Sequence, residues 1–420
     1  MNNDCFAVEN RLMALDEAFA LIAAQVQPVT ATEVVPLRRC VGRILAEDVI
    51  SPIAQPSFRN AAMDGFAAHH KDLDAGGPTR LPVVGRVAAG HPHAASLPQG
   101  GAIEIFTGAP LPEEFDTVAM IEDCRVEEAA GQRWVVLPPG LKAGNYVRPI
   151  GEDFGQGSVV LAAGRRLRPQ DVAMAAAVGR ASLLVRQPLK VGVISTGDEV
   201  VEPGNRLAEG QIYGSNRYGQ MALLEAMGFA VTDLGHLPDD FSATVTALAE
   251  AARSQQAIVT SGGVSVGGED HVKAAVETLG RLHLWRLALK PGKPVALGQI
   301  GDAAFLGLPG YPVSAMVTLM VAGRAALFRL AGATAEPPLP QPAIVPAGFT
   351  AKQNHKRRQF LRGSLQSVDG RQAAVPFATQ QSSVLSSLVQ TTGLIDLGPD
   401  LPEIRPGDPV PFYPYESLMR

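Results

Sequence analysis

PLKVGVISTGDEV, from Pro188 to Val200, is an apolar run that ends in a glycine loop with two acids. The same order recurs downstream, because the apolar segments Ala230–Leu237 and Ala257–Thr260 are each followed by a loop and then by helical spacing. Continuous apolar runs of this length are typical of strands that are buried on both faces. Strands that alternate with helices predict an α/β fold, with a doubly wound, mostly parallel sheet.

The ends of the expected helices support this prediction. Gly228 and Gly280 each close a segment with helical periodicity, and glycine commonly follows the last turn of a helix. We expect these helices at about 216–227, 241–253 and 270–279. A further strand at 304–308 leads through the turn Pro309-Gly310-Tyr311-Pro312 into a long helix that ends near Leu330.

The segments on either side differ in character. Residues 10–26 place apolar side chains three and four apart, which predicts an amphipathic helix, and 169–178 is an Ala-rich helix candidate. Short strands of a small β-rich unit are expected at 81–84, 102–106 and 134–137. A connector rich in Pro and Ala covers 333–346, and the remainder has the short apolar runs and turns of a small β domain.

Composition excludes several classes of protein. A net charge of −5 over 420 residues is incompatible with the broad basic surface that binds nucleic acid non-specifically. Cys5, Cys40 and Cys124 are too far apart for a CxxC zinc site and suit reduced thiols. The first residues lack a basic-then-apolar signal pattern, and the apolar stretch 313–323 is too short to span a bilayer. We therefore expect a soluble cytoplasmic protein without a membrane partner.

Acidic pairs follow the first three strands of the 188–330 segment. They are Asp198-Glu199, Asp239-Asp240 and Glu269-Asp270. In an open α/β sheet, ligands bind outside the carboxyl ends of the strands, so the three pairs are expected at one edge. One interpretation is that each acid only caps the next helix. The other is a shared crevice for Mg²⁺, which favours one or two carboxylates together with phosphate oxygens.

Groups that attract anions are expected at the same edge. Ser261-Gly262-Gly263 forms a strand-to-helix turn that can present backbone N–H groups, although an ordinary tight turn looks the same. Lys290-Pro291-Gly292-Lys293-Pro294 places two lysines on a stiff turn, and Leu308–Ser314 opens a helix. Carboxylates beside lysines and helix ends indicate a phosphorylated or nucleotide-like substrate. Spacing alone does not place the acids of two upstream loops, Asp64 and Asp153, against this edge.

These segments together resemble the molybdopterin molybdenumtransferases, the family of bacterial MoeA and the gephyrin E domain. The matching motifs run in order over nearly the whole chain: Asn60–Gly65 (NAAMDG), Thr107–Pro110 (TGAP), Val147-Arg148 with Gly151–Asp153 (GED), Ser195–Glu199 (STGDE), Ser261–Gly267 (SGGVSVG), Lys290–Pro294 (KPGKP) and Leu308–Ser314.

The resemblance implies an elongated homodimer of four-domain subunits. The implied domains are a discontinuous N-terminal dimerisation domain (1–53 and 143–187), an inserted β-rich domain (54–142), an α/β molybdopterin-binding domain (188–332) and a C-terminal β domain (333–420). The implied reaction transfers molybdenum from molybdate, a substrate, to adenylylated molybdopterin, with Mg²⁺-dependent release of AMP. Molybdopterin adenylyltransferase and client molybdoenzymes are the implied partners.

The resemblance also assigns residues. The implied catalytic acids are Asp64, Asp153, Glu199, Asp239, Asp240 and Asp270, of which Glu199, Asp239 and Asp270 would bind the metal. The implied substrate-binding residues are Thr107, Ser195, Thr196, Gly197, Ser261, Gly262, Gly263, Arg286, Lys290, Lys293, Pro309, Pro312, Arg358 and Arg362.

The chain departs from the family pattern at several positions. Arg59 and Ala61 replace the usual Asp and Ser of the first motif, Gly214 stands where Asp is usual, and Tyr311 where Asn is usual. Arg286 stands where a Lys is common. Two alternatives therefore stay open, a degenerate paralogue that acts as a scaffold or chaperone for cofactor delivery, and a molybdopterin adenylyltransferase.

Overall fold

The computed structural model describes residues 12–92, 97–262, 271–292, 294–352, 357–368, 370–399, 401 and 403–419. The chain forms two compact units. The larger unit contains Met1–Glu47, Ala162–Val172 and Ala181–Arg420, and the smaller contains Asp48–Leu161 and Ala173–Arg180. The finer division into four domains stays a prediction.

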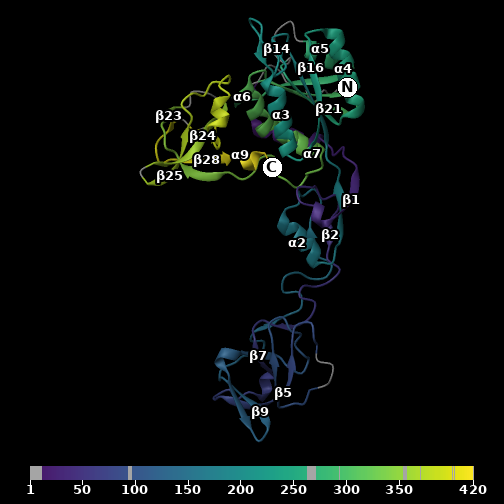
Figure 1. The fold of residues 1–420 in the computed structure, drawn as a ribbon. Coiled ribbons are helices and arrows are strands. Elements are labelled where there is room, and N and C mark those ends of the chain that lie inside the picture. The colour runs from purple at the N-terminus through teal and green to yellow at the C-terminus, as the bar shows by residue number, and fades with distance from the viewer. Residues whose placement is uncertain are drawn as a thin grey trace, which may run out of the picture. The chain divides into compact units, whose positions relative to one another are not determined.

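The core of the larger unit is a six-stranded sheet with the order β16-β13-β17-β21-β20-β18. Its strands are β13 (Lys190–Thr196), β16 (Ala230–Leu237), β17 (Ala257–Ser261), β18 (Gly280–Arg286), β20 (Pro294–Ile300) and β21 (Ala303–Leu308). Strands β16 and β21 of this sheet are labelled in Figure 1. The first four strands in this order are parallel, whereas β20 and β18 are antiparallel to their neighbours. The predicted doubly wound, mostly parallel sheet is confirmed, with an antiparallel pair at one side.

The register brings the ends of the parallel strands level. Ser195 on β13 pairs with Ser261 on β17, Ser261 pairs with Leu308 on β21, and Thr196 pairs with Leu237 on β16. Four loops therefore leave the sheet at one edge, beginning at Gly197, Pro238, Gly262 and Pro309. This is the shared edge that the alternation of strands and helices predicts.

Helices cover both faces of this sheet. They are α3 (Ser215–Ala226), α4 (Phe241–Ser254), α5 (His271–Leu279), α6 (Pro312–Thr318) and α7 (Arg324–Leu330), with a π-helical turn, η4 (Leu319–Gly323), between the last two. Val191 and Val193 of β13 pack in one cluster with Leu223 of α3, while Ile194 packs in another with Leu248 of α4. Successive strand side chains point to opposite faces, so the continuous apolar run fills two cores at once.

The C-terminal strands form a second sheet in the larger unit, with the order β19-β24-β26-β28-β22 and β25 beside β24. These strands are β19 (Leu289–Lys290), β22 (Ala343–Pro346), β24 (Arg358–Val368), β25 (Arg371–Pro376), β26 (Gly393–Leu397) and β28 (Pro409–Pro414). The shorter elements beside them are β23 (Ala351–Lys352), β27 (Glu403–Ile404), α8 (Ser386–Val389) and α9 (Tyr415–Leu418). Because β19 pairs with β24, the lysine turn is joined to this sheet. The predicted connector 333–346 is too long at its C-terminal end, since β22 begins at Ala343.

The N-terminal part of the larger unit contains α1 (Leu15–Gln25), the antiparallel pair β1 (Thr32–Pro36) and β12 (Ser182–Arg186), and a 3₁₀ turn, η1 (Leu37–Arg39). The helix expected over 10–26 begins later, at Leu15, because Met13 is held in a bridge to Leu287. One helical stretch, Pro312–Leu330, has the length and composition of a membrane span, but 83% of it is buried inside the protein, as in the core helix of a globular fold.

The smaller unit is β-rich, as predicted. Its main sheet has the order β7-β4-β6-β5-β9-β8. The strands are β4 (Gly65–Ala68), β5 (Thr79–Val87), β6 (Ala102–Ile105), β7 (Thr117–Met120), β8 (Arg125–Ala129) and β9 (Gln132–Leu137). Its other elements are the strand pairs β2 (Val49–Ile50) with β11 (Val159–Leu161) and β3 (Asn60–Ala61) with β10 (Val147–Arg148), and the 3₁₀ turns η2 (His70–Asp72) and η3 (Ile121–Asp123). Helix α2 (Pro169–Ala177) is shared between the two units.

Candidate functional site

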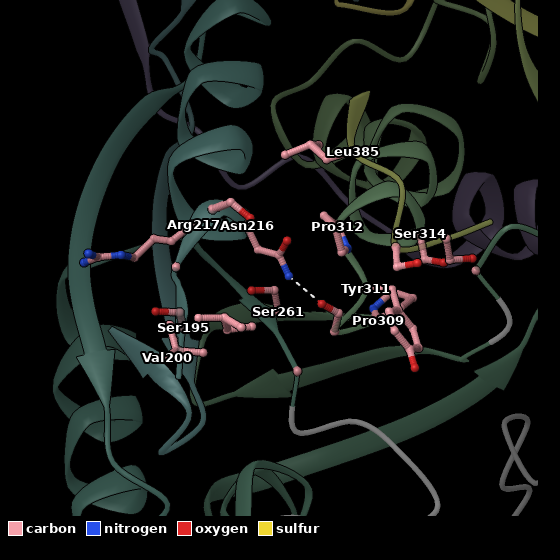
Figure 2. A pocket seen from close by; sticks show the side chains of 18 of the residues that line it. Ser195, Val200, Asn216, Arg217, Ser261, Pro309, Tyr311, Pro312, Ser314 and Leu385 are labelled. Atoms are coloured by element: carbon pink, nitrogen blue, oxygen red, sulfur yellow. Dashed lines mark hydrogen bonds between the residues drawn. The ribbon is translucent and has the colours of Figure 1, made fainter. Parts of the chain in front are cut away.

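A cavity of about 1070 Å³ opens at the carboxyl edge of the parallel strands in the larger unit (Figure 2). Its wall combines the loop after β13, the start of α3, the lysine turn, the start of α6 and a C-terminal segment before α8. The predicted substrate-binding and catalytic residues that line it are Ser195, Thr196, Glu199, Ser261, Gly262, Lys290, Pro309 and Pro312. Residues that lie far apart in the sequence thus meet in one cavity.

Among the described residues, Glu199 is the acid that lines the cavity, and its carboxylate lies against Gly197. Gly197 has a φ of +123°, and a Cβ built on it would lie 2.5 Å from Glu199 Oε2. The carboxylate therefore folds back over a backbone position whose left-handed φ favours glycine. The backbone of Glu199 is fixed as well, because its carbonyl accepts a hydrogen bond from the Ile212 N–H at 2.8 Å. That contact joins β14 (Val200–Val201) to β15 (Ile212–Tyr213).

Asp239 and Asp240 have different surroundings. Asp239 Oδ2 accepts from the Asp198 N–H at 3.4 Å, and Asp198 Oδ1 accepts from the Asp239 N–H at 3.1 Å, so these two loops hold each other. Asp240 Oδ1 accepts from the Ala243 N–H at 2.7 Å, which is an N-cap of α4. The structure therefore gives Asp240 the capping role that the sequence left open, and neither acid lines the cavity.

The start of α3 supplies polar groups that the sequence analysis did not select. Gly214, Ser215, Asn216 and Arg217 all line the cavity. Asn216 Nδ2 donates to the Gly310 carbonyl at 2.6 Å and so ties α3 to the turn before α6 (Figure 2). Gly214, at the N-cap, has no side chain to accept a hydrogen bond from the first turn, so this helix end borders the cavity without a side-chain cap. The sequence carries one sign of this uncapped helix end, because Gly214 stands where the family pattern described above usually has an Asp that could cap the helix.

Arg217 is a second feature that the sequence analysis missed. Its side chain is only 5% exposed, and its Nη1 donates to Asp233 Oδ1 on β16 at 2.6 Å. Its Nη2 donates to Glu202, which also accepts from the Tyr218 hydroxyl. Figure 2 shows the guanidinium directed away from Asn216. Arg217 is therefore neutralised by two carboxylates and acts as a structural clamp on the wall that carries Glu199.

The lysine turn packs directly on α6. Lys290 lies in β19, beside the C-terminal sheet, and it lines the cavity. Gly292 has a φ of +98°, and a Cβ on it would lie 2.1 Å from Thr318 Oγ1. Among the described residues, that buried hydroxyl has no hydrogen-bond partner. The close approach of this turn to α6 therefore depends on a glycine.

The predicted arginines lie elsewhere. Arg358 pairs with Asp396 at 2.7 Å and with Asp16 at 3.2 Å. Arg362 is 1% exposed, and its Nε donates to Ser387 Oγ at 3.1 Å. Both guanidinium groups are thus held inside the larger unit. Arg286 is the last residue of β18, and it does not line the cavity either.

The C-terminal part of the chain also contributes to the cavity wall. Arg357, Ser382, Ser383 and Leu385, from the C-terminal part of the chain, line the cavity, although the sequence analysis did not select them. The predicted residues Gly263, Asp270 and Lys293 lie outside the described residues.

The smaller unit holds the remaining predicted residues. Asp64 Oδ1 accepts from both the N–H and the hydroxyl of Thr107, each at 2.7 Å. These two donors, the backbone N–H first, hold the pKa of the Asp64 carboxyl below its usual value. Asp153 lines a separate pocket of about 400 Å³ with Asn60, whose buried Oδ1 has no partner among the described residues.

The donor set fits Mg²⁺ bound together with substrate. Within the described part of the chain, no three acid, His or Cys side chains gather as a ready metal site. Mg²⁺ does not require one, because it is commonly bound through one or two carboxylates and the phosphates of a substrate. Glu199, seated against Gly197 in a cavity that also carries Lys290 and the start of α3, provides such a carboxylate.

Three family models match the chain in order. Residues 13–179 match the MoeA N-terminal region (domain I and II), 192–329 a probable molybdopterin binding domain, and 345–415 the MoeA C-terminal region (domain IV). The middle match contains most of the cavity wall, and the last contains its C-terminal residues.

Relatives match over most of the chain. The Haemophilus influenzae protein named molybdopterin molybdenumtransferase is 37% identical over 409 residues, covering 97% of this chain and 100% of that protein. A Synechococcus elongatus protein of the same name is 40% identical over 73% of this chain and 78% of its own length. The solved structure of a molybdopterin biosynthesis MoeA protein from Pyrococcus horikoshii superposes with a TM-score of 0.77 at 27% identity, covering 96% of this chain and 100% of that one. The chain belongs to the molybdopterin molybdenumtransferase family.

Proposed function

We propose that this protein transfers molybdenum from molybdate to adenylylated molybdopterin and releases AMP in the same reaction. The observation that carries the proposal is the cavity at the strand edge, which combines Glu199, Lys290 and the start of α3. The similarity over most of the chain to proteins named molybdopterin molybdenumtransferase supports the same activity.

The cavity suits a large substrate with several phosphate oxygens. Its volume of about 1070 Å³ is at the upper end of ordinary ligand pockets. Lys290 supplies a positive charge, and the N-terminus of α3, a helix of 12 residues without a side-chain cap, borders the same space and would attract anionic groups. The turn at Ser261-Gly262, where Gly262 has a φ of +90°, lets the backbone approach a bound group closely.

Each group has a distinct task in the proposed reaction. Glu199, together with Asp270, would hold Mg²⁺, which neutralises charge that develops on the phosphates. Lys290 and the α3 N–H groups orient the phosphates, so that the leaving AMP departs from a fixed position. Asp239 is a third candidate ligand, and its bonds to the Asp198 loop keep it near the strand edge.

We propose that the protein is a homodimer and that the smaller unit also supplies residues that act on the substrate. Asp64, held ionised by Thr107, and Asp153, beside the unpartnered oxygen of Asn60, are arranged to accept hydrogen bonds or to meet a cation. We further propose a cytoplasmic location, and transient contact with a molybdopterin adenylyltransferase and with client molybdoenzymes.

AMP release tests the proposal. Purified protein is mixed with adenylylated molybdopterin, and AMP is followed by chromatography with molybdate and Mg²⁺ both present, or with either one omitted. We expect release only when both are present. Consumption of ATP with unmodified molybdopterin would instead indicate an adenylyltransferase, and substrate binding without release would indicate a scaffold.

A further inference from the structure

Tyr311 is an aromatic side chain that the larger unit leaves exposed inside its cavity. It lines the cavity between Pro309-Gly310 and Pro312. It is 64% exposed, the largest value among the described aromatic side chains. Figure 2 shows it beside Pro309 and Pro312, at the start of α6. A ring that is left in solvent at the wall of a large cavity has apolar area available for a ligand.

The backbone under this ring is fixed. Tyr311 has a φ of −72° and a ψ of 133°, and Pro312, which follows it directly, restricts its backbone to extended conformations. Its carbonyl accepts from the Ala315 N–H at 2.9 Å, and the preceding Gly310 carbonyl accepts from Asn216 at 2.6 Å. The ring therefore stands on a rigid support, and binding a ligand would order only the side chain.

The ring is not occupied by a contact within the protein. Arg217 and Arg358, two cations of this unit, are placed over the rings of Tyr218 and Phe360 instead. Among the described residues, neither an aromatic ring nor a cation stacks on Tyr311, and its hydroxyl has no hydrogen-bond partner. Its side chain does not cap α6 either. Among the described residues, no contact of Tyr311 within the protein therefore explains an exposed aromatic ring at this position.

We propose that Tyr311 is a specificity-determining residue whose ring stacks on a flat heteroaromatic ring of the substrate. This inference rests on the proposed function, because adenylylated molybdopterin contains two such rings, an adenine and a pterin. Stacking requires only a π face, so either ring could be the partner of Tyr311. Both rings are planar nitrogen heterocycles that the substrate carries together with phosphate groups. The phosphate would lie toward Lys290 and α3, which line the same cavity.

The test compares Tyr311→Phe with Tyr311→Leu. Phe keeps the ring and Leu keeps apolar bulk without it. Phe241→Leu is the matched control, because Phe241 is an exposed aromatic residue at the start of α4 that does not line the cavity. We expect Tyr311→Leu to raise the KM for AMP release about 5- to 10-fold, while Tyr311→Phe and Phe241→Leu stay within about twofold of the unmodified protein.

Calorimetric binding of AMP alone and of unmodified molybdopterin alone identifies the stacked ring. If Tyr311→Leu weakens AMP binding, the partner is adenine; if it weakens molybdopterin binding, the partner is the pterin. Unchanged KM and unchanged binding of both ligands would overturn the inference, and so would an equal loss in Tyr311→Phe, which would indicate the hydroxyl. If the unmodified protein binds both ligands but releases no AMP, the proposed function fails while the binding data still decide the role of Tyr311.

Discussion

Replacing Gly292 by Ala tests how the lysine turn is seated on α6. The residue has a φ of +98°, and alanine in such a conformation costs roughly 1–3 kcal/mol. The new Cβ would also lie 2.1 Å from Thr318 Oγ1, and such overpacking in a core adds roughly 1–3 kcal/mol. The sum, about 2–6 kcal/mol, corresponds to a fall in Tm of roughly 4–24 °C, at about 2–4 °C per kcal/mol for a large domain. Because Lys290 belongs to the same turn, the KM of AMP release should rise as well.

Two further variants separate these causes. Gly301→Ala places alanine at a φ of +57° with nothing within 4 Å of the new Cβ, so it measures the conformational cost alone. Thr318→Ala removes a buried hydroxyl that has no partner among the described residues, so alone it should cost little. Added to Gly292→Ala, it should restore about 1–3 kcal/mol, the overpacking part of the loss.

Tryptophan fluorescence can follow the thermal unfolding of the larger unit, which contains Gly292 and Thr318. The chain has two tryptophans, Trp134 in β9 and Trp285 in β18, so a Trp134→Phe background reports on the larger unit alone. Equal melting temperatures for Gly292→Ala and Gly301→Ala, or no gain in stability when Thr318→Ala is added to Gly292→Ala, would refute the close contact between the lysine turn and α6.

Three more predictions address single residues. Glu199→Gln should still bind adenylylated molybdopterin in calorimetry but should release AMP about 100-fold more slowly, because the carboxylate proposed to hold Mg²⁺ is lost. An unchanged rate would exclude Glu199 from the mechanism. Asp240→Ala should lower Tm by roughly 2–4 °C through loss of the α4 cap and leave AMP release intact, whereas a slow variant of full stability would contradict the capping role. Thr107→Val should raise the pKa of Asp64 in an NMR titration, though not fully, because the backbone N–H remains. A depressed pKa stabilises the folded state at pH values above the pKa of the unfolded state, and this stabilisation is lost as the pH falls through the folded pKa. In Thr107→Val the folded pKa lies closer to the unfolded one, so the pH range over which this stability is lost should be narrower. An unchanged Asp64 titration would contradict the hydrogen-bond assignment.

The architecture of the larger unit was largely predictable from the sequence, because its parallel strands are continuous apolar runs and helices α3 and α5 are closely followed by Gly228 and Gly280. Val191, Val193 and Ile194 had to be buried on both faces, which leaves little choice besides a parallel sheet. The antiparallel pair β18 and β20 was not predicted. Its strands follow each other as a hairpin around the lysine turn, and a continuous apolar pattern carries no sign of strand direction.

The site was predictable where a residue type is required by its place at a strand end, as for Glu199 and Lys290. It was not predictable where tertiary pairing decides the role. Nothing local shows that Asp240 caps its own helix while Asp239 bonds to another loop, since both acids follow the same strand. Arg217 was missed because its carboxylate partners, Glu202 and Asp233, are distant in sequence and arginine is ordinarily exposed.

The ratio of molybdenum incorporated to AMP released tests the central claim most directly. After one turnover with excess molybdate, the pterin product is separated, its metal content is measured by mass spectrometry, and AMP is quantified in the same sample. If the cavity couples cleavage to metal transfer, one molybdenum atom accompanies each AMP. Release of AMP without metal in the product would show that the protein is only a hydrolase of the adenylylated pterin, contrary to this account.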